Sequence, residues 1–341
     1  MAELLLAIGF LLAIAFTVVN GFHDASNANA LPVRFNALTP RVAVGMGAVF
    51  NVLGALTVGL VLTQLIPFDI PVPISTVGTV VIICTLVTAV AWDLLTWWWA
   101  MPASSTAAMS GGIIGSLAGA YAVGLAPDLA VHGDTVWQLV LSLVVAPAVA
   151  FILAQVLVFV AVYLVRHQAP GVVKRRSAVV QATGAAAIHF GHGIQHGRRA
   201  IWVFVVLLMC HGLVIPISGI PWWISVLVGL CLGAGTLLGG WRIAYTLSSR
   251  VVNLDPLRGA VAQTVAGSLL FIGGFLASFP MSTSQTSTAA ILGAGTLQRF
   301  RTVYHRTLVQ VLTTWAVTVP VCAVVAGTLF LAASPLLQLG A

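Results

Sequence analysis

Asn20-Gly-Phe-His-Asp-Ala-Ser-Asn-Ala-Asn29 places a run of polar side chains inside an otherwise apolar stretch that extends from residue 4 to residue 32. A second polar run, His189-Phe-Gly-His-Gly-Ile-Gln-His-Gly-Arg-Arg199, lies inside another apolar stretch in the second half of the chain. Apolar segments that are interrupted at matching places in two halves of a chain are typical of secondary transporters, and the interruptions mark the substrate site. We therefore expect two broken helices, one in each half, near the midplane of a membrane.

The composition requires a membrane protein. Of the 341 residues, 60% are apolar and only 6% are charged, whereas about a quarter of the residues in a soluble domain are charged. Such a chain cannot cover the surface of a water-soluble globule, which excludes soluble enzymes and nucleic-acid-binding proteins. A membrane-spanning helix needs about 20 residues, so the length allows roughly ten. The sequence predicts an all-α polytopic membrane protein.

The apolar elements divide into two sets of five. We expect them at about residues 4–32, 40–66, 74–100, 102–122, 135–166, 179–218, 222–245, 256–279, 280–298 and 303–338. The elements at 102–122 and 280–298 fit either full crossings or re-entrant hairpins. Because five is odd, the second set begins on the opposite face of the membrane, so two like halves form inverted repeats. We assign residues 1–166 to the first repeat, 167–178 to a basic linker and 179–341 to the second repeat.

The charges predict the orientation of the chain. Net charge is +7, from 14 Lys and Arg against 7 Asp and Glu. Arg34, Arg41 and the linker are basic, whereas the connections at 67–73 and 123–134 carry only acidic residues: Asp69, Asp128 and Asp134. Basic loops of multi-pass proteins face the cytoplasm. We therefore expect the N-terminus outside and the linker inside.

Asp24 is the acidic residue of the first polar run. An ionised carboxylate at membrane depth costs several kcal/mol unless it is paired or hydrated, so such a residue is a functional candidate. Asn27 and other amide, hydroxyl and imidazole side chains lie beside it in the sequence. The alternative is a helix that ends at Asn20-Gly21 and continues as a solvated loop.

Two Pro-Ser/Thr clusters occupy matching places in the halves. They read Pro102-Ala-Ser-Ser-Thr106 and Pro280-Met-Ser-Thr-Ser-Gln-Thr-Ser287. Proline favours the first turn of a helix, where backbone N–H groups have no intrahelical partner. Those N–H groups, the hydroxyls and the helix dipole together make a site for an oxyanion. The alternative is that the hydroxyls bond to their own helix or join helices.

The roles of the other polar residues in the apolar segments remain open between several alternatives. His192 and His196 are four residues apart, as in metal-binding pairs on a helix, but the glycines around them argue against a regular helix. A proton relay or an anion contact by His196, with Arg198 or Arg199 adding positive charge, is favoured over a metal site. The remaining alternative is that the histidines are structural and bond within the fold. Asp93 lies among tryptophans that are typical of a membrane interface, where it would be hydrated, or it has a role in transport.

Together these motifs resemble the PiT family of inorganic phosphate transporters. The first polar run is similar to the family's first signature, an Asn-Gly-x-x-Asp-x-Ala-Asn-Ala string, with Ser26 in place of the usual alanine. Trp92-Asp-Leu-Leu-Thr-Trp97 and the cluster at 102–106 resemble the family's Trp-Asn-x-x-Thr-Trp and Pro-x-Ser-Ser segments. Further motifs follow the order of its second half: Gly240-Trp-Arg242, Leu254-Asp-Pro256 and Pro280-Met-Ser-Thr283. The resemblance covers nearly the whole chain.

The resemblance implies symport of phosphate across a bacterial inner membrane, with the substrate between the two signatures and the two hairpins. The phosphate-binding residues that it implies are Asp24, Asn27, Ser104, Ser105, Thr106, Gln195, His196, Ser282, Thr283 and Ser284. The expected partners are inorganic phosphate, protons and the lipid bilayer, with a homodimer as an open alternative. No cofactor, metal ion or nucleic acid is expected.

Two departures from the family pattern bear on the coupling ion. Sodium-coupled members carry glutamates where this chain has Asn51 and Gln263, and proton-coupled bacterial members are similar to this chain at both places. With Asp24 and His196, these two positions are the expected coupling residues. The second signature usually reads His-Gly-Ala-Asn-Asp, whereas this chain reads His192-Gly-Ile-Gln-His196, so the site has lost one negative charge.

Four alternatives to a proton-coupled phosphate symporter remain at this point. They are a sodium-coupled phosphate symporter, a permease for sulfate or another oxyanion, a transport-dead phosphate sensor, and a membrane metalloprotein built on the histidines of the second polar run. Hydroxyls and backbone N–H groups bind sulfate and phosphate alike, so an acceptor for a protonated phosphate oxygen, such as Asp24, must discriminate between them.

Overall fold

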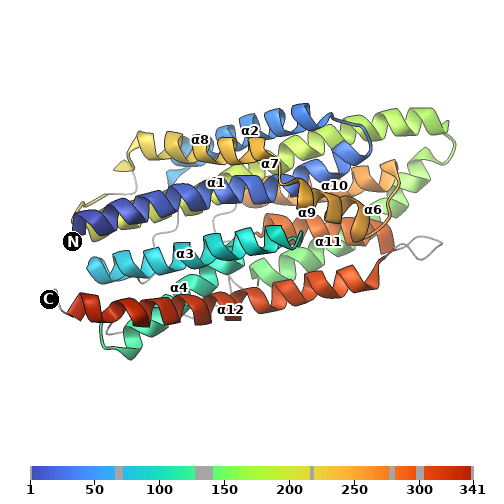
Figure 1. The fold of residues 1–341 in the computed structure, drawn as a ribbon. Coiled ribbons are helices and arrows are strands. Elements are labelled where there is room, and N and C mark those ends of the chain that lie inside the picture. The colour runs from blue at the N-terminus through green and yellow to red at the C-terminus, as the bar shows by residue number, and fades with distance from the viewer. Residues whose placement is uncertain are drawn as a thin grey trace.

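The apolar runs of the sequence fold into long helices that lie side by side along one direction, with both chain ends at the same end of the molecule (Figure 1). The computed structural model describes residues 2–65, 72–126, 141–215, 219–275, 281–296 and 303–338. Within these residues there is no β-strand, and the only β-type pairing is an isolated antiparallel bridge between Val252 and Val303. The predicted all-α fold is confirmed. Pro280, Asp69, Asp128 and Asp134 lie outside the described residues.

The long helices correspond to the predicted elements. Those of the first half are α1 (Ala2–Arg34), α2 (Pro40–Leu56), α3 (Thr76–Trp98), α4 (Ser105–Ala122) and α6 (Ala146–Val165). Those of the second half are α7 (Pro170–Cys210), α8 (Trp222–Leu238), α10 (Pro256–Phe275), α11 (Thr283–Thr296) and α12 (His305–Gln338), with a short α9 (Trp241–Tyr245) after α8. Helix α7 begins earlier than expected because most of the basic linker is itself helical.

Five helical segments of the described residues are long and apolar enough to cross a membrane. They are Ala2–Arg34, Pro40–Val61, Thr76–Trp98, Leu143–Val165 and His305–Leu337. Helices α8 and α9 form a further broken span, bent by 56°. The bend falls at Gly239 and Gly240, whose φ angles of 89° and 54° are left-handed and suit glycine because it lacks a Cβ. The expected multi-pass membrane protein is confirmed.

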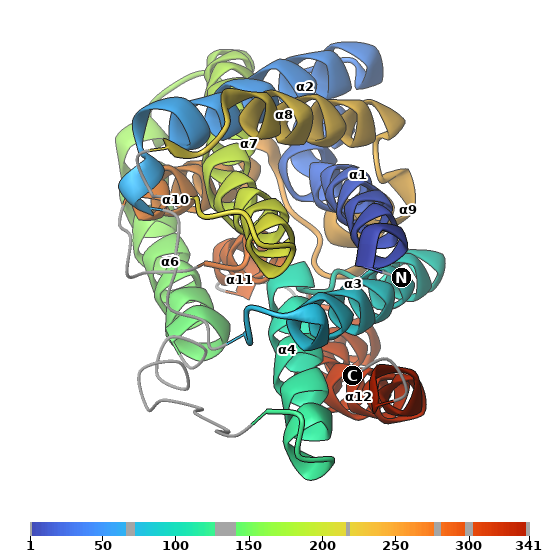
Figure 2. The same ribbon diagram turned by 90° about the vertical axis from the view of Figure 1, so that its left-hand side faces the viewer.

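Helix contacts made by the first half recur in the second. The pair α1–α8 matches α7–α2, the pair α4–α12 matches α11–α6, and the pair α3–α4 matches α10–α11. This correspondence supports two repeats of five long helices. Several of the largest contacts join helices of opposite halves, so the halves are interlaced instead of lying apart (Figures 1 and 2).

Helices α1 and α7 run unbroken through the two polar runs, so the predicted broken helices are wrong. The glycines there serve close packing. A Cβ on Gly21 would collide with the backbone carbonyl of Leu232 on α8, and a Cβ on Gly193 with that of Asn51 on α2. Small residues that let membrane helices approach at backbone distance are typical of such interfaces. Asp24, Asn27, His23 and His192 bond to one another, so these side chains find partners without a loop.

Two apolar clusters fill the interior, and α1 and α7 pass through both. Phe16 of α1 and Ile194 of α7 belong to one cluster, which also includes α3, α4 and α8. Leu31 of α1 and Ile188 of α7 belong to the other, which includes α6, α10 and α11. The polar residues between these positions therefore lie at the junction of the two clusters, partway along the helices.

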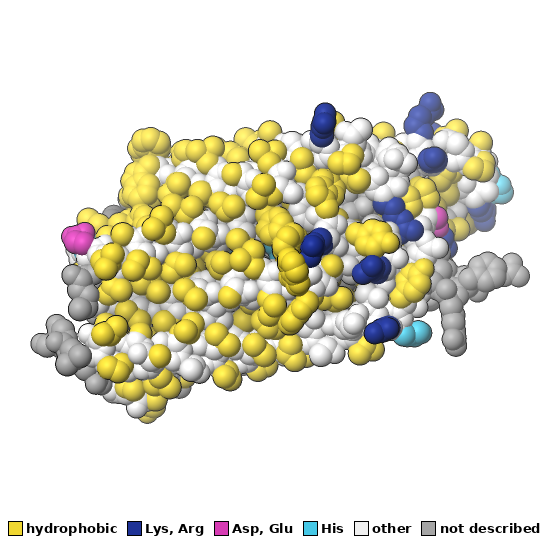
Figure 3. Space-filling view, viewed as in Figure 1, with side chains coloured by type: hydrophobic (Ala, Val, Ile, Leu, Met, Phe, Trp, Pro, Cys, Tyr) yellow, Lys and Arg dark blue, Asp and Glu magenta, His cyan; other side chains and the backbone are white. Residues whose placement is uncertain are grey.

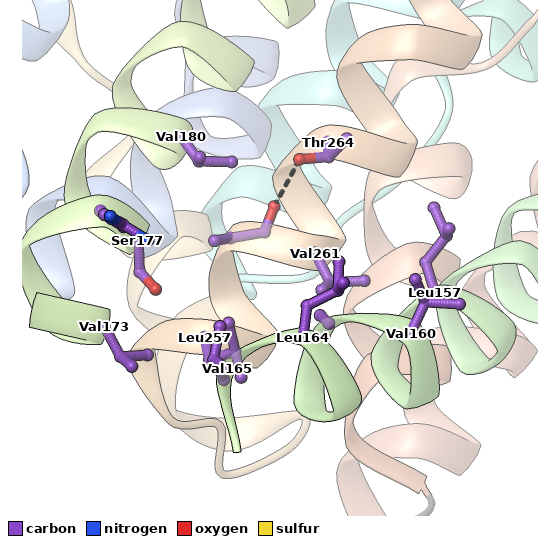
Figure 4. A pocket seen from close by; sticks show the side chains of 13 residues that line it. Leu157, Val160, Leu164, Val165, Val173, Ser177, Val180, Leu257, Val261 and Thr264 are labelled. Atoms are coloured by element: carbon purple, nitrogen blue, oxygen red, sulfur yellow. Dashed lines mark hydrogen bonds between the residues drawn. The ribbon is translucent and has the colours of Figure 1, made fainter. Parts of the chain in front are cut away.

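Basic side chains gather toward the end of the molecule opposite the chain termini, whereas the rest of the visible face is mainly apolar (Figure 3). The structure thus agrees with the prediction that basic connections share one side. A groove of about 300 Å³ lies between α6, α7 and α10 (Figure 4). Apolar side chains such as Leu164, Val173 and Val261 line it, with Arg176 at its edge. None of the predicted phosphate-binding residues contributes to this groove.

Candidate functional site

Asp24, Asn27 and Ser284 come together from opposite halves of the chain, as the sequence predicts for a shared site. The Ser284 hydroxyl donates to Asp24 Oδ1 at 2.8 Å, and Asn27 Nδ2 donates to the same oxygen at 3.2 Å. Asn27 Nδ2 also donates to the Ser284 hydroxyl at 2.9 Å. All three side chains are buried, so α1 and the start of α11 are joined through one carboxylate.

Two histidines flank Asp24. His23 Nδ1 lies 3.2 Å from Asp24 Oδ1, and His192 Nε2 lies 3.4 Å from Asp24 Oδ2. His192 also places its two ring nitrogens 2.8 Å from the Oδ1 atoms of Asn20 and Asn51. Each ring nitrogen of an imidazole either donates or accepts one hydrogen bond, so His192 joins α1, α2 and the Asp24 carboxylate through a single ring.

The coupling candidates Asn51 and Gln263 form hydrogen bonds to the two helices that carry the polar runs: Asn51 to α7 and Gln263 to α1. Asn51 Nδ2 donates to the Thr236 hydroxyl at 2.9 Å and lies 3.2 Å from His189 Nδ1. Gln263 Nε2 donates to the carbonyl of Ala28 in α1 at 3.0 Å. In the described residues, no three His, Cys, Asp or Glu side chains gather as metal ligands, so the metalloprotein alternative gains no support.

Both hairpin helices start at a buried serine cap. Ser104 Oγ accepts from the backbone N–H of Ala107 at 3.2 Å, and Ser282 Oγ accepts from that of Gln285 at 3.4 Å. The backbone N–H groups that follow each cap have no partner within their helix. Each start therefore presents N–H donors and the positive end of a helix dipole, which suits an oxyanion. Thr283 is buried and Thr106 is half-buried at these starts.

Gln195 and Arg199 of α7 position the second hairpin. Gln195 Oε1 accepts from the backbone N–H of Met281 at 2.9 Å, and its Nε2 donates to the carbonyl of Leu270 at 3.4 Å. Arg199 donates to the Met281 carbonyl at 3.2 Å. Both the oxygen and the nitrogen of the Gln195 amide thus form hydrogen bonds to backbone groups of α10 and of the segment before α11. These bonds fix the position of the start of α11.

Asp24 and the side chains in contact with it (His23, Asn27, His192 and Ser284) form what we call the Asp24 cluster. His196 lies beside this cluster and forms no hydrogen bond to it in the described residues. Its ring is stacked on His192, with centroids 5.5 Å apart, and packs against Phe16 at 5.2 Å. The side chain is buried, and neither ring nitrogen has a hydrogen-bond partner in the described residues. The stacking shows that the second polar run is a regular helix, contrary to the expectation from its glycines.

Asp93 is buried, so the interpretation of a hydrated residue at the membrane interface is wrong. It lies on α3 within electrostatic range of His23 and beside Ser105 at the start of α4. The start of α11 reaches Asp24 directly through Ser284. The start of α4 lies near the same residues through Asp93, which is beside Ser105 and within electrostatic range of His23 and Asp24.

The residues predicted to bind phosphate or to couple ions leave out several members of the site: Asn20, His23, His192, which the sequence suggests only as one of a possible metal-binding pair, and Thr236. The first three lie in the two polar runs that predicted the site, and their signal was proximity to Asp24 and Gln195 along the sequence. Thr236 lies in the apolar run of α8 and bonds to Asn51 and to the carbonyl of Leu232. A threonine in such a run most often bonds to its own helix, so no sequence signal marks it.

The arrangement combines one carboxylate acceptor, imidazole and amide groups, and hydroxyl and N–H donors. Donors of this kind surround the oxygens of a tetrahedral oxyanion, and a carboxylate accepts from a protonated oxygen of the same anion. The site has the chemistry of reversible oxyanion binding.

Comparison with known proteins agrees with this chemistry. The family model described as phosphate transporter family matches residues 20–326. A Bacillus subtilis protein named "Probable low-affinity inorganic phosphate transporter" is 32% identical over 312 residues, covering 91% of this chain and 92% of that protein. A Rhizobium meliloti protein of the same name is 31% identical over 325 residues, covering 94% of each chain.

A solved structure shares the fold. It is titled "The sodium-dependent phosphate transporter" and matches with a TM-score of 0.76 and 18% identity, covering 96% of this chain and 98% of that one. The family match spans both polar runs and both hairpin starts, and the relatives match along nearly their whole length. The chain belongs to the phosphate transporter family, whose members are transporters and not enzymes.

Proposed function

We propose that this chain imports inorganic phosphate in symport with protons. The observation that carries the proposal is the bond of Ser284 and Asn27 to Asp24, because it connects the first polar run to a hairpin start of the other half. Phosphate bound there would meet hydroxyl and backbone N–H donors from the hairpins and the carboxylate of Asp24. The curated relatives named as low-affinity inorganic phosphate transporters support this substrate.

The carboxylate favours phosphate over sulfate. Phosphate near neutral pH retains at least one P–OH group, which donates to a carboxylate, whereas sulfate has no proton to donate. A site that hydrogen-bonds a substrate hydroxyl rejects an analogue without it strongly, because its own polar group is then left unpaired. Asp24 would act as this acceptor.

The coupling ion is proposed to be the proton. Sodium sites of secondary transporters use the backbone carbonyls of unwound helices, and α1 and α7 remain helical along the polar runs. Asn51 and Gln263 provide neutral amides where sodium-coupled members carry glutamates. Phosphate carries negative charge inward against a potential worth about 2.3 kcal/mol per charge per 100 mV, so a cation or proton must accompany it, and the two neutral amides favour the proton.

We also propose the orientation. The basic end would face the cytoplasm of a bacterial cell and both termini the outside of its inner membrane, because basic residues of multi-pass proteins concentrate on the cytoplasmic side. Phosphate would then reach the junction of the two apolar clusters from either side in turn, by alternating access around a site that stays near the midplane.

The test is uptake of ³²P-phosphate by the purified protein in proteoliposomes. One arm imposes a pH gradient without sodium, another imposes a sodium gradient at equal pH, and a third adds excess sulfate. We expect accumulation under the pH gradient and little competition by sulfate. Uptake under the sodium gradient alone would overturn proton coupling, and phosphate binding without flux would overturn transport itself in favour of a sensor. Strong competition and uptake of labelled sulfate would favour the oxyanion permease.

A further inference from the structure

Asp93 is a buried carboxyl group that the hydrogen-bonded network around Asp24 does not use. It is fully enclosed, with 0% of its surface exposed. Neither of its carboxyl oxygens has a hydrogen bond of good geometry within the described part of the chain. The donor nearest to them is the buried Ser105 hydroxyl, which faces the carboxyl group and has no well-formed bond of its own. Unpartnered buried polar groups are rare in folded proteins and call for an explanation.

In the part of the chain that the structure describes, no lysine or arginine is among the groups that face Asp93. From α1 come His23 and Asp24, from α4 the Ser105 hydroxyl, and from α12 the thiol of Cys322. Two arginines on other helices that touch α3 have partners of their own. Arg242 of α9 stacks on Trp97 and Trp98 and donates to a backbone carbonyl, and Arg199 of α7 donates to Met281.

His23 is also committed to other partners. Its Nδ1 lies 3.2 Å from Asp24 Oδ1, and its Nε2 lies 3.3 Å from the Thr96 hydroxyl. Thr96 is one turn beyond Asp93 on α3 and bonds back to the Asp93 carbonyl at 3.2 Å. The imidazole thus contacts the Asp24 carboxylate on one side and, through Thr96, the backbone carbonyl of Asp93 on the other; no ion pair between His23 and the Asp93 carboxyl group is found among the described residues.

An ionised carboxylate in this environment is costly, because burial of a charge without a partner or hydrogen bonds loses its hydration without replacement. A neutral carboxylic acid avoids this cost, and it needs a single acceptor such as the adjacent Ser105 hydroxyl. Asp24 differs, since its oxygens receive bonds from Ser284, Asn27 and the two histidines. Of these two acids, Asp24 suits the charged form and Asp93 the protonated form.

We propose that Asp93 is a proton-binding site of this transporter, occupied when phosphate is bound and emptied on the cytoplasmic side. The inference rests on the proposed proton symport and assigns its proton to a residue outside the motifs that predicted coupling. It follows from the enclosure of the carboxyl group, its oxygens without a well-formed hydrogen bond and its position next to Ser105 and His23.

Coupling then follows from electrostatics. A phosphate anion between the hairpin starts would be repelled by a second carboxylate so close to Ser105, so it binds when Asp93 carries its proton. Once phosphate leaves, the proton leaves through a rearrangement that hydrates Asp93, because the charged form needs water. No bond of the phosphate is made or broken, and the net movement is one proton at this site with each anion.

The experiment compares the wild type with Asp93→Asn, Asp93→Glu and the matched control Asp255→Asn. Asp255 caps the start of α10 and pairs with Arg258, away from the site. Each purified protein is reconstituted and assayed for ³²P-phosphate accumulation under a pH gradient and for phosphate exchange at equal pH across the membrane. Infrared difference spectra provide a second measurement, because a protonated carboxylic acid has a carbonyl band that an amide lacks.

We expect Asp93→Asn to lose at least about tenfold of the gradient-driven accumulation, which corresponds to 1.4 kcal/mol, and to exchange phosphate with little dependence on pH. Asp93→Glu restores accumulation, Asp255→Asn behaves as wild type, and the carboxylic acid band is missing from Asp93→Asn alone. Asp93→Ser serves as a second uncharged variant if the asparagine protein does not fold.

The outcomes separate the two proposals. A wild type driven by pH together with an equally driven Asp93→Asn would overturn the assignment of Asp93 and leave proton symport standing. An unchanged carboxylic acid band in Asp93→Asn would also overturn it. A wild type that accumulates phosphate only with sodium would overturn proton symport itself.

Discussion

The hydroxyl of Ser284 donates to Asp24 Oδ1 at 2.8 Å, although the two residues are 260 positions apart in the sequence. This bond joins α1 to the start of α11, and Asn27 reinforces it by donating to both groups. Because the pair belongs to opposite halves, the binding site can form only when both repeats are folded together.

Asp24→Asn tests the acceptor in this pair. The substitution removes a carboxylate that accepts from Ser284 and Asn27 and contacts His23 and His192, and buried donors left without an acceptor cost about 1–3 kcal/mol each. We expect loss of both gradient-driven uptake and phosphate exchange, measured in proteoliposomes. Asp255→Asn is the control for the chemical change. Uptake at the wild-type rate in Asp24→Asn would contradict the role given to this carboxylate.

Ser284→Ala tests the donor. A hydrogen bond to a charged group contributes about 1.5–3 kcal/mol, so phosphate affinity should fall roughly tenfold to 100-fold. Binding isotherms of ³²P-phosphate to the detergent-solubilised protein give the change. Thr264→Val is the matched hydroxyl deletion, since Thr264 bonds to a carbonyl of its own helix. Equal affinities for Ser284→Ala and Thr264→Val would remove Ser284 from the site.

The two stacked histidines should differ in their effect on transport. His192→Gln removes a ring that contacts Asp24, Asn20 and Asn51, whereas His196→Gln removes a ring whose nitrogens have no hydrogen-bond partner among the described residues. We expect His192→Gln to reduce pH-driven uptake at least tenfold more than His196→Gln does. The reverse order would return the coupling role to His196, which the family resemblance favours.

Gly193→Ala tests the close packing of α7 on α2. The added methyl group would lie 2.5 Å from the Asn51 carbonyl oxygen, and overpacking of this kind costs about 1–3 kcal/mol. A lower Tm in detergent is the expected result. Gly45→Ala is the control, because a Cβ there meets nothing within 4 Å and alanine is favoured over glycine in a helix by about 1 kcal/mol. A Tm unaffected by Gly193→Ala would contradict the packing argument.

Composition and hydropathy were sufficient to predict the helices, because apolar runs in a membrane have one way to satisfy their backbone. The same reasoning failed at the polar runs. Gly21 and Gly193 indicate a broken helix when seen singly, and the backbone of a neighbouring helix that approaches each of them is not visible in the sequence. The real break, at Gly239-Gly240, lies in a segment that was expected to be continuous.

For the candidate site, the polar runs and the Pro-Ser/Thr clusters predict which segments of the chain lie together. The hydrogen-bond partners within that group of residues could be identified only from the folded structure. Asp93 shows why. Its tryptophan neighbours are typical of an interface, but Trp92 Nε1 donates to the Thr318 hydroxyl inside the molecule. The direction in which one residue of a helix faces depends on helices distant in sequence, here α1, α4 and α12.

The interlacing of the two halves has a mechanical consequence. Helix α4 contacts α12 through Gly111 and Gly115, and α11 contacts α6 through Gly293, in each case at backbone distance. Each hairpin helix is therefore fastened to a helix from the other half. We expect α4 to move together with α12, and α11 together with α6, during a transport cycle, so that each moving unit combines helices from both halves of the chain.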